Sequence, residues 1–141
     1  RNKSFDAAIK AALAGVRVQA EIYNEINGAY AASAVSPDVF IGACRQNTSG
    51  YGNHIFSDQN ILNAMVDANT KSGGIIIGGG QLLSKTNCAV SQISYAAAVT
   101  LRNTTTRSWC IDSAGFARQL NVGAGSAILG DGSAGDPYRC Q

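Results

Sequence analysis

Charged residues are scarce in this chain of 141 residues, where 11 basic and 9 acidic side chains make up only 14% of the sequence. A typical soluble domain carries about a quarter. The formal net charge of +2 is too small for the strong positive field that a dedicated nucleic-acid-binding protein needs. Runs of ~18 apolar residues, the length of a membrane-spanning helix, are also lacking. Composition and length therefore predict one soluble domain with the lightly charged surface common among secreted and cell-surface proteins.

Side chains that carry catalysis are equally few. The only histidine, His54, has no cysteine or aspartate partner at a suggestive spacing, and we expect it to be a surface-loop residue. The glycine-rich residues 74–81 lack the Gly-Lys-Ser/Thr ending of a phosphate-binding loop, which favours a flexible turn. A Gly-x-Ser-x-Gly nucleophile motif is absent as well. The sequence therefore predicts a protein that is not an enzyme and has no cofactor.

The four cysteines are widely spaced, without the C-x-x-C pairs typical of zinc and thioredoxin-like sites. An even count at wide spacing favours two structural disulfides and therefore an oxidising compartment. Three pairings are possible, and the sequence alone does not settle the choice. We expect Cys44 to pair with Cys88, because this bond would fix a long irregular segment against the sheet. We expect Cys110 to pair with Cys140, because this bond would hold the C-terminal tail.

Residues 3–27 predict one long helix around which the rest of the chain is organised. At about 100° per residue, one apolar stripe contains Phe5, Ile9, Leu13, Val16, Ala20 and Tyr23. A second apolar strip contains Ala7, Ala11, Ala14, Gly15, Val18, Ile22 and Ile26. One interpretation is that alanine, the best helix former, is tolerated on any face. The other is that the second strip packs on something outside this domain, with Ala11, Val18, Ile22 and Ile26 as the contact residues.

The next segment, residues 28–87, predicts a largely irregular connection with one short helix. Its first part is expected to be irregular, with residues 39–41 as a short apolar anchor. The short helix is expected over residues 58–71. Ser57 is the expected capping residue, and Phe56 and Ile61 stand at the two positions of a hydrophobic staple.

Residues 88–122 predict an antiparallel sheet with alternating side chains. In the first strand, the expected inward residues are Ile93, Tyr95, Ala97, Val99 and Leu101, and the expected outward residues are Ser94, Ala96, Ala98, Thr100 and Arg102. A second strand at residues 108–113 places Trp109 and Ile111 on one face and Cys110 on the other. Residues 116–122 alternate as a third strand.

The remaining residues, 123–141, are rich in glycine and are expected to form a tail tethered by a disulfide. The order of a long helix, a variable connection and an antiparallel sheet predicts a single α+β domain over residues 1–141, with the long helix packed on one face of the sheet.

Two polar features of the C-terminal half are weak candidates for binding. Asp131 and Asp136 lie in a glycine-rich loop whose carboxylates are potential Ca²⁺ ligands, although Asp-Gly is also ordinary turn chemistry. Four arginines, with Trp109 or Tyr138 to stack on bases, are candidates for a DNA groove, although dispersed arginines are more typical of a solvated surface. These arginines are Arg102, Arg107, Arg118 and Arg139.

Three stretches of the chain resemble bacterial type IV pilins. Residues 1–23, RNKSFDAAIKAALAGVRVQAEIY, resemble the exposed half of the long N-terminal helix of that family. Residues 26–30, INGAY, are similar to its helix exit, and residues 108–115, SWCIDSAG, resemble a strand and turn of one branch of pilin-like proteins. The resemblance implies a type IV pilin-like fold and a structural, non-catalytic subunit of an extracellular pilus (fimbrium) on the bacterial cell surface, used for adhesion, motility or DNA uptake.

In the family, the long helix continues upstream into a very hydrophobic half that carries a peptidase cleavage site and an early glutamate. Neither is present in this sequence, and we expect a preceding segment. The resemblance implies other pilin subunits and the pilus assembly machinery as partners, with the inner membrane reached only through that segment before assembly. Two alternatives stay open: a pseudopilin of a type II-like secretion system, and a minor pilin that binds DNA or a host surface.

Overall fold

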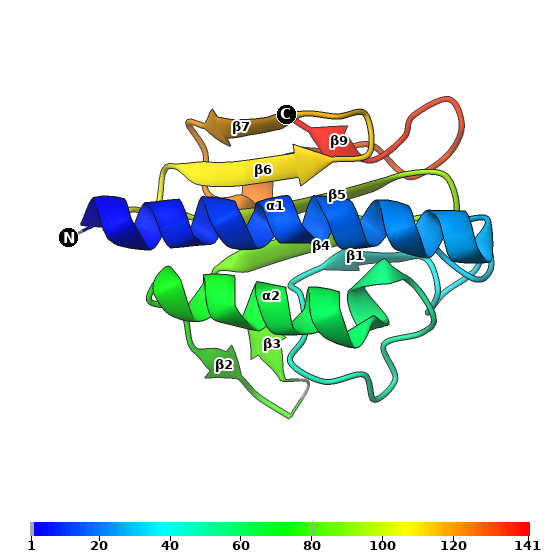
Figure 1. Cartoon of the computed structure of the whole chain (residues 1–141), viewed down its shortest axis with the longest axis horizontal. Helices are drawn as coiled ribbons and strands as arrows, with labels where there is room; N and C mark the ends of the chain where they lie inside the picture. The colour runs from blue at the N-terminus through cyan, green and yellow to red at the C-terminus, as the bar shows by residue number, and fades with distance from the viewer. Residues whose placement is uncertain (1, 80) are drawn as a thin grey trace.

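Two helices lie on one face of a five-stranded antiparallel sheet in the computed structural model, which describes residues 2–79 and 81–141 (Figure 1). The predicted α+β class is confirmed. Arg1 and Gly80, which the sequence places in the first helical stretch and in the glycine-rich turn, lie outside the described residues. Neither helix in the described part of the chain combines the length and apolarity needed to cross a membrane.

The long helix α1 spans Asn2–Asn27 and crosses the whole sheet (Figure 1). Its predicted apolar stripe is the buried face, and Ile9, Leu13, Val16 and Ala20 expose none of their surface. The helix ends at Gly28, which adopts a φ of +77° and donates its N–H to the Asn24 carbonyl at 2.7 Å. This is the left-handed glycine stop typical of helix C-termini.

The second helix, α2, spans Gln59–Lys71 and packs beside α1 on the same face of the sheet. The predicted cap was wrong by one residue: Asp58, not Ser57, accepts the N–H groups of Asn60 at 3.1 Å and Ile61 at 3.3 Å. Ser57 instead closes a short 3₁₀ turn, η1 (Ile55–Ser57). Because the staple positions are counted from the cap, Phe56 and Ile61 no longer occupy them. Both of these side chains are nevertheless buried in the common core.

The main sheet has the strand order β1-β4-β5-β6-β7 with all neighbours antiparallel. The strands are β1 (Phe40–Gly42), β4 (Thr86–Val90), β5 (Tyr95–Thr100), β6 (Ser108–Asp112) and β7 (Ala117–Leu120). Three strands therefore lie where the alternating pattern predicted them. The face of β5 that carries Tyr95, Ala97 and Val99 belongs to the core shared with the two helices, as expected.

Two strands and one turn correct the sequence analysis. Residues 40–42, predicted as an anchor within an irregular loop, form edge strand β1, paired with β4. Strand β4 was missed because all five of its residues are buried, so it shows no alternation. Ile93, predicted to face inward in a strand, lies in the turn before β5 and is 54% exposed.

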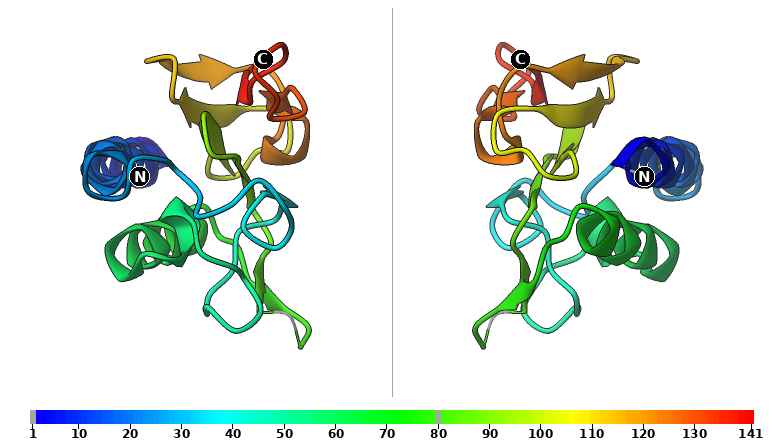
Figure 2. Two further views of the ribbon diagram at one scale, coloured as in Figure 1. Left: turned by 90° about the vertical axis from the view of Figure 1, so that its right-hand side faces the viewer. Right: turned by 90° about the vertical axis from the view of Figure 1, so that its left-hand side faces the viewer.

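The expected outward face of β5 is not exposed, because the C-terminal segment covers it. This segment contains η2 (Ala124–Ser126), β8 (Ile128–Leu129) and β9 (Arg139–Cys140). Ala98 packs there against Ala124 and Ala127, and Ala96 packs against Tyr138. Viewed along α1, the helices lie on one side of the sheet and this segment, in orange and red, on the other (Figure 2). The domain therefore has three layers.

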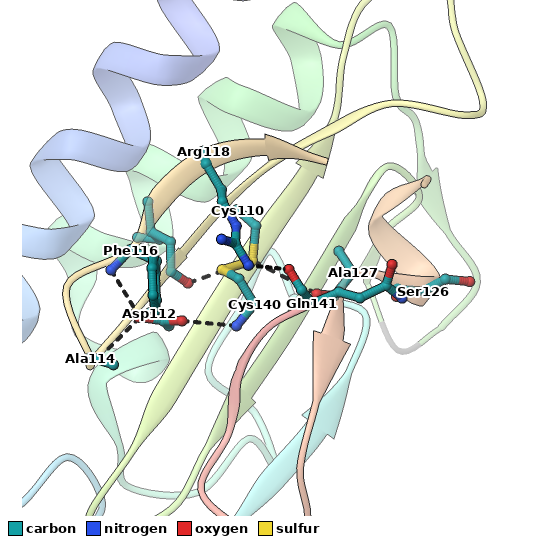
Figure 3. The surroundings of a disulfide bond; sticks show 10 residues. Cys110, Asp112, Ala114, Phe116, Arg118, Ser126, Ala127, Cys140 and Gln141 are labelled. Atoms are coloured by element: carbon teal, nitrogen blue, oxygen red, sulfur yellow. Dashed lines mark hydrogen bonds between the residues drawn. A yellow bond between two sulfur atoms is a disulfide. The ribbon is translucent and has the colours of Figure 1, made fainter. Parts of the chain in front are cut away.

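The two predicted disulfide pairings are confirmed. Cys44 is bonded to Cys88 with Cα atoms 5.2 Å apart, and Cys110 to Cys140 with Cα atoms 5.9 Å apart. The second bond ties the C-terminal segment to β6. A buried carboxylate supports it: Asp112 accepts the Cys140 N–H at 2.9 Å with one oxygen and the N–H groups of Ala114 and Phe116 with the other (Figure 3).

Candidate interaction surface

The second apolar strip of α1 faces solvent along the length of the helix. We call it the α1 strip: Ala7, Ala11, Ala14, Gly15, Val18, Ile22 and Ile26, all of which are exposed. Its large members Val18, Ile22 and Ile26 expose 60%, 42% and 78% of their surface. Tolerance of alanine on any helix face does not account for three exposed β-branched residues in one row. Contiguous exposed apolar surface of this kind is typical of an interaction site.

Beside the α1 strip lies an elongated depression of about 670 Å³, which we call the α1 groove. Its apolar wall on the helix comprises Ala14, Val18 and Ile22. The opposite wall is formed by Tyr95 of β5 and by the β6–β7 turn, which contributes Gly115. The groove therefore lies between the free face of α1 and the β6–β7 turn, with the buried Tyr95 beneath it.

Charged side chains along α1 line the groove and are partly held in place. Tyr30, whose ring packs edge-on against Tyr95 at 5.1 Å, donates its hydroxyl to both carboxylate oxygens of Glu21, at 3.0 and 2.9 Å. Burial, followed by the hydrogen bond to Glu21, raises the pKa of Tyr30 to about 12. Arg17 donates to the Gly115 carbonyl at 3.4 Å, across the groove. Glu25 lies one turn beyond Glu21 and completes the lining.

A second exposed apolar surface lies on the far side of α2 from α1, on three consecutive isoleucines that precede the glycine-rich turn (Figure 1). The strands β2 (Ile76–Ile77) and β3 (Leu82–Leu83) pair with each other in a separate small sheet, and Leu82 of β3 also forms a bridge with Arg45. Ile75, Ile76 and Ile77 expose 68%, 39% and 48% of their surface. This hairpin projects at the end of the molecule opposite β7 (Figure 2).

The prediction that His54 lies on the surface was wrong. Its side chain is fully buried against the rings of Phe40 and Tyr51. Its Nδ1 accepts the Phe56 N–H at 3.1 Å, so Nε2 carries the proton and donates to the Tyr51 carbonyl at 2.7 Å. Burial lowers the pKa of His54 to about 4. The histidine is therefore a neutral structural residue that caps a turn, not a reactive group.

The weak Ca²⁺ candidates Asp131 and Asp136 are engaged in local contacts. Asp131 accepts the N–H of Ser133 at 2.9 Å, which is ordinary turn bonding, and hydrogen bonds lower its pKa. Asp136 forms an ion pair with Arg139 at 2.6 Å. Among the described residues, no group of three His, Cys, Asp or Glu side chains is arranged to hold a metal ion.

Three of the four arginines considered for a DNA groove, Arg102, Arg118 and Arg139, make separate local contacts. The guanidinium of Arg102 lies 4.4 Å from the ring centre of Phe5 and donates to the Lys71 carbonyl at 3.1 Å. Arg118 lies over Phe116 and donates to the Gln141 carbonyl. Tyr138, one of the two aromatic residues considered for stacking on bases, is buried in the third layer. DNA binding stays an untested alternative.

Comparison with known proteins adds no identification: no family model, no curated protein and no solved structure matches this chain. The functional argument therefore rests on the α1 strip, the α1 groove and the hairpin. Sequence periodicity found the first of these. The groove was not predicted, because it depends on how far the β6–β7 turn stands from α1.

Proposed function

We propose that this chain is the globular head of a type IV pilin, a non-catalytic structural subunit of a filament on the bacterial cell surface. The filament is extracellular and serves adhesion, motility or DNA uptake. The partners of the chain are then other copies of the same subunit and the machinery that assembles them. The resemblance of residues 1–23 and 108–115 to pilins introduced this hypothesis.

The exposed α1 strip is the single observation that carries the proposal. One face of α1 is already satisfied by the core of its own domain, where Ile9, Leu13 and Val16 are fully buried. Val18, Ile22 and Ile26 stand on the other side and gain from burial only in an assembly. Burying each of them would contribute roughly 1 kcal/mol or more. A subunit that buries the free face of its helix against neighbouring copies in a filament has this two-faced helix.

The order and linkage of the elements also support the proposal. A long N-terminal helix lies across an antiparallel sheet, a variable connection with a short helix follows it, and a disulfide tethers the C-terminal segment. The pseudopilin alternative depended on a Ca²⁺ loop at Asp131 and Asp136. Because Asp136 is paired with Arg139, no specific observation favours that alternative.

The experiment uses source cells, where antibodies raised against this chain are expected to label surface filaments in electron micrographs. Deleting the gene should remove these filaments, and the full-length wild-type gene should restore them. The double variant Val18→Glu and Ile22→Glu should yield stable protein but no filaments. The matched control Ile93→Glu changes an exposed isoleucine outside the strip and should assemble normally. Filaments that persist unlabelled in the deletion strain would refute the proposal.

A further inference from the structure

The β2–β3 hairpin leaves large apolar side chains exposed to solvent. Three consecutive isoleucines, Ile75 to Ile77, are exposed, and their hairpin is separate from the five-stranded sheet. The hairpin is held on the domain by Leu83, which is fully buried and donates its N–H to the Cys44 carbonyl at 2.8 Å, whereas the three isoleucines stay exposed. Three adjacent exposed apolar residues are a liability for a folded protein unless they serve a contact. These exposed isoleucines, Ile75 to Ile77, therefore form an apolar projection suited to a contact with another surface, and we call them the knob.

The α1 groove is complementary to the knob, because it is an apolar depression large enough to receive aliphatic side chains. Its wall on α1 is aliphatic, from Ala14, Val18 and Ile22, and its volume of about 670 Å³ accommodates branched aliphatic side chains. The knob and the groove lie on different parts of the surface, because the hairpin projects beyond α2 whereas the groove lies between α1 and the β6–β7 turn (Figures 1 and 2). One molecule therefore presents both surfaces to different neighbours.

The charges next to the two surfaces are opposite in sign. Three carboxylates line the groove, Glu21, Glu25 and the buried Asp112, against one cation, Arg17. Two cations stand at the base of the hairpin: Lys71, the last residue of α2, which lies 3.9 Å from the Asp67 carboxylate, and Lys85, two residues after β3. Opposite charges of this kind orient the two surfaces in a contact. Like charges disfavour alternative contacts, such as the pairing of two hairpins.

We propose that the β2–β3 hairpin of one copy of this chain packs into the α1 groove of the next copy, an inference that rests on the proposed filament function and names the segments that meet. In a filament this contact is heterologous, with the hairpin of each copy in the groove of the next, so that it repeats from copy to copy. The contact is small compared with a stable interface. The isolated chain is therefore a monomer at micromolar concentration, with association only at about 1 mM.

Two one-sided variants test the contact by NMR on the isolated chain. Ile76→Ser removes the knob and keeps the groove, and Val18→Lys blocks the groove and keeps the knob. Each is ¹⁵N-labelled at low concentration and titrated with unlabelled wild type to about 1 mM. Amides of the groove should shift in labelled Ile76→Ser, and amides of the hairpin should shift in labelled Val18→Lys. Ile93→Ser, a matched exposed isoleucine, should behave as wild type in both roles.

Several outcomes would overturn the inference. One is the absence of shifts with the wild-type chain at about 2 mM. Another is groove shifts of full size when the unlabelled partner is itself Ile76→Ser. Circular dichroism and amide dispersion verify the fold of each variant, and Ile75→Ser replaces Ile76→Ser if the latter does not fold. Antibody-labelled filaments, together with no hairpin–groove contact in the NMR titration, would refute the inference alone. The contact in the NMR titration, together with no filaments on the source cells, would refute the proposed function alone.

Discussion

Lowering the pH from 7 to 5 should destabilise this protein through His54, its only histidine. In the folded chain the neutral ring accepts the Phe56 N–H at Nδ1. Protonation of Nδ1 would break this bond and leave two donors facing each other. Burial, the largest cause, holds the pKa of His54 at about 4, against an ordinary value of 6.5. Nearby Arg45 also lowers this pKa, whereas the Tyr51 carbonyl and Asp38 raise it.

The sign and size of the effect follow from proton linkage. Near pH 5 the unfolded chain binds a proton at His54 and the folded chain does not, so acid favours unfolding. The stability is fully present above pH 6.5 and is lost progressively down to about pH 4. At pH 5 the two pKa values give a loss of about 2 kcal/mol in the free energy of unfolding. The pKa of Asp38 is itself lowered, so its own contribution is lost only below about pH 4, outside this window.

Urea denaturation at pH 7, 6 and 5 measures this loss. A decrease of about 2 kcal/mol corresponds to a fall of about 1 M in the urea midpoint. The variant His54→Asn keeps a capping side chain but does not titrate, so it should be less stable at pH 7 and lose most of the pH dependence. An equal slope in wild type and variant, or a His54 ring that titrates in the folded protein near pH 6.5, would refute the reasoning.

Three further predictions concern the core, the tail and nucleic acid. Leu13→Ala, in the buried face of α1, should lower the free energy of unfolding by about 3 kcal/mol. Val18→Ala, on the free face, should change it by less than about 0.5 kcal/mol. Equal costs would contradict the assignment of the two faces. Replacing Cys110 and Cys140 by alanine should cost about 3 to 4 kcal/mol and expose the C-terminal segment to limited proteolysis, and a tail that stays protected would count against this tethering role. Duplex DNA should bind more weakly than about 1 µM at physiological salt in a fluorescence titration, and tighter binding would favour a DNA-uptake role.

The parts of the fold that local patterns specify could be predicted from the sequence. The two faces of α1 follow from a periodicity sustained over 26 residues, and the structure buries one face and exposes the other. Strands β5 and β6 are located by alternation. The disulfide pairing was expected because one bond would fix the long irregular segment against the sheet and the other would hold the C-terminal tail.

The missed features depend on contacts between residues far apart in the chain. Strand β1 has only three residues, and its partner β4 lies more than 40 residues later. His54 is buried by Phe40 and Tyr51, which no local pattern places beside it. Ala98 looks solvent-facing by alternation, yet a segment some 25 residues downstream covers it. The α1 groove was not predicted for the same reason, because its two walls come from separate layers of the domain.

The central claim is that the α1 strip is buried between copies in an assembled filament. The most direct measurement is the rate at which a maleimide reacts with Ile26→Cys, since Ile26 is 78% exposed in the isolated chain. The account predicts rapid labelling of the isolated chain and strong protection in filaments, whereas Ile93→Cys stays reactive in both. Equal labelling of Ile26→Cys in filaments and in the isolated chain would contradict the claim.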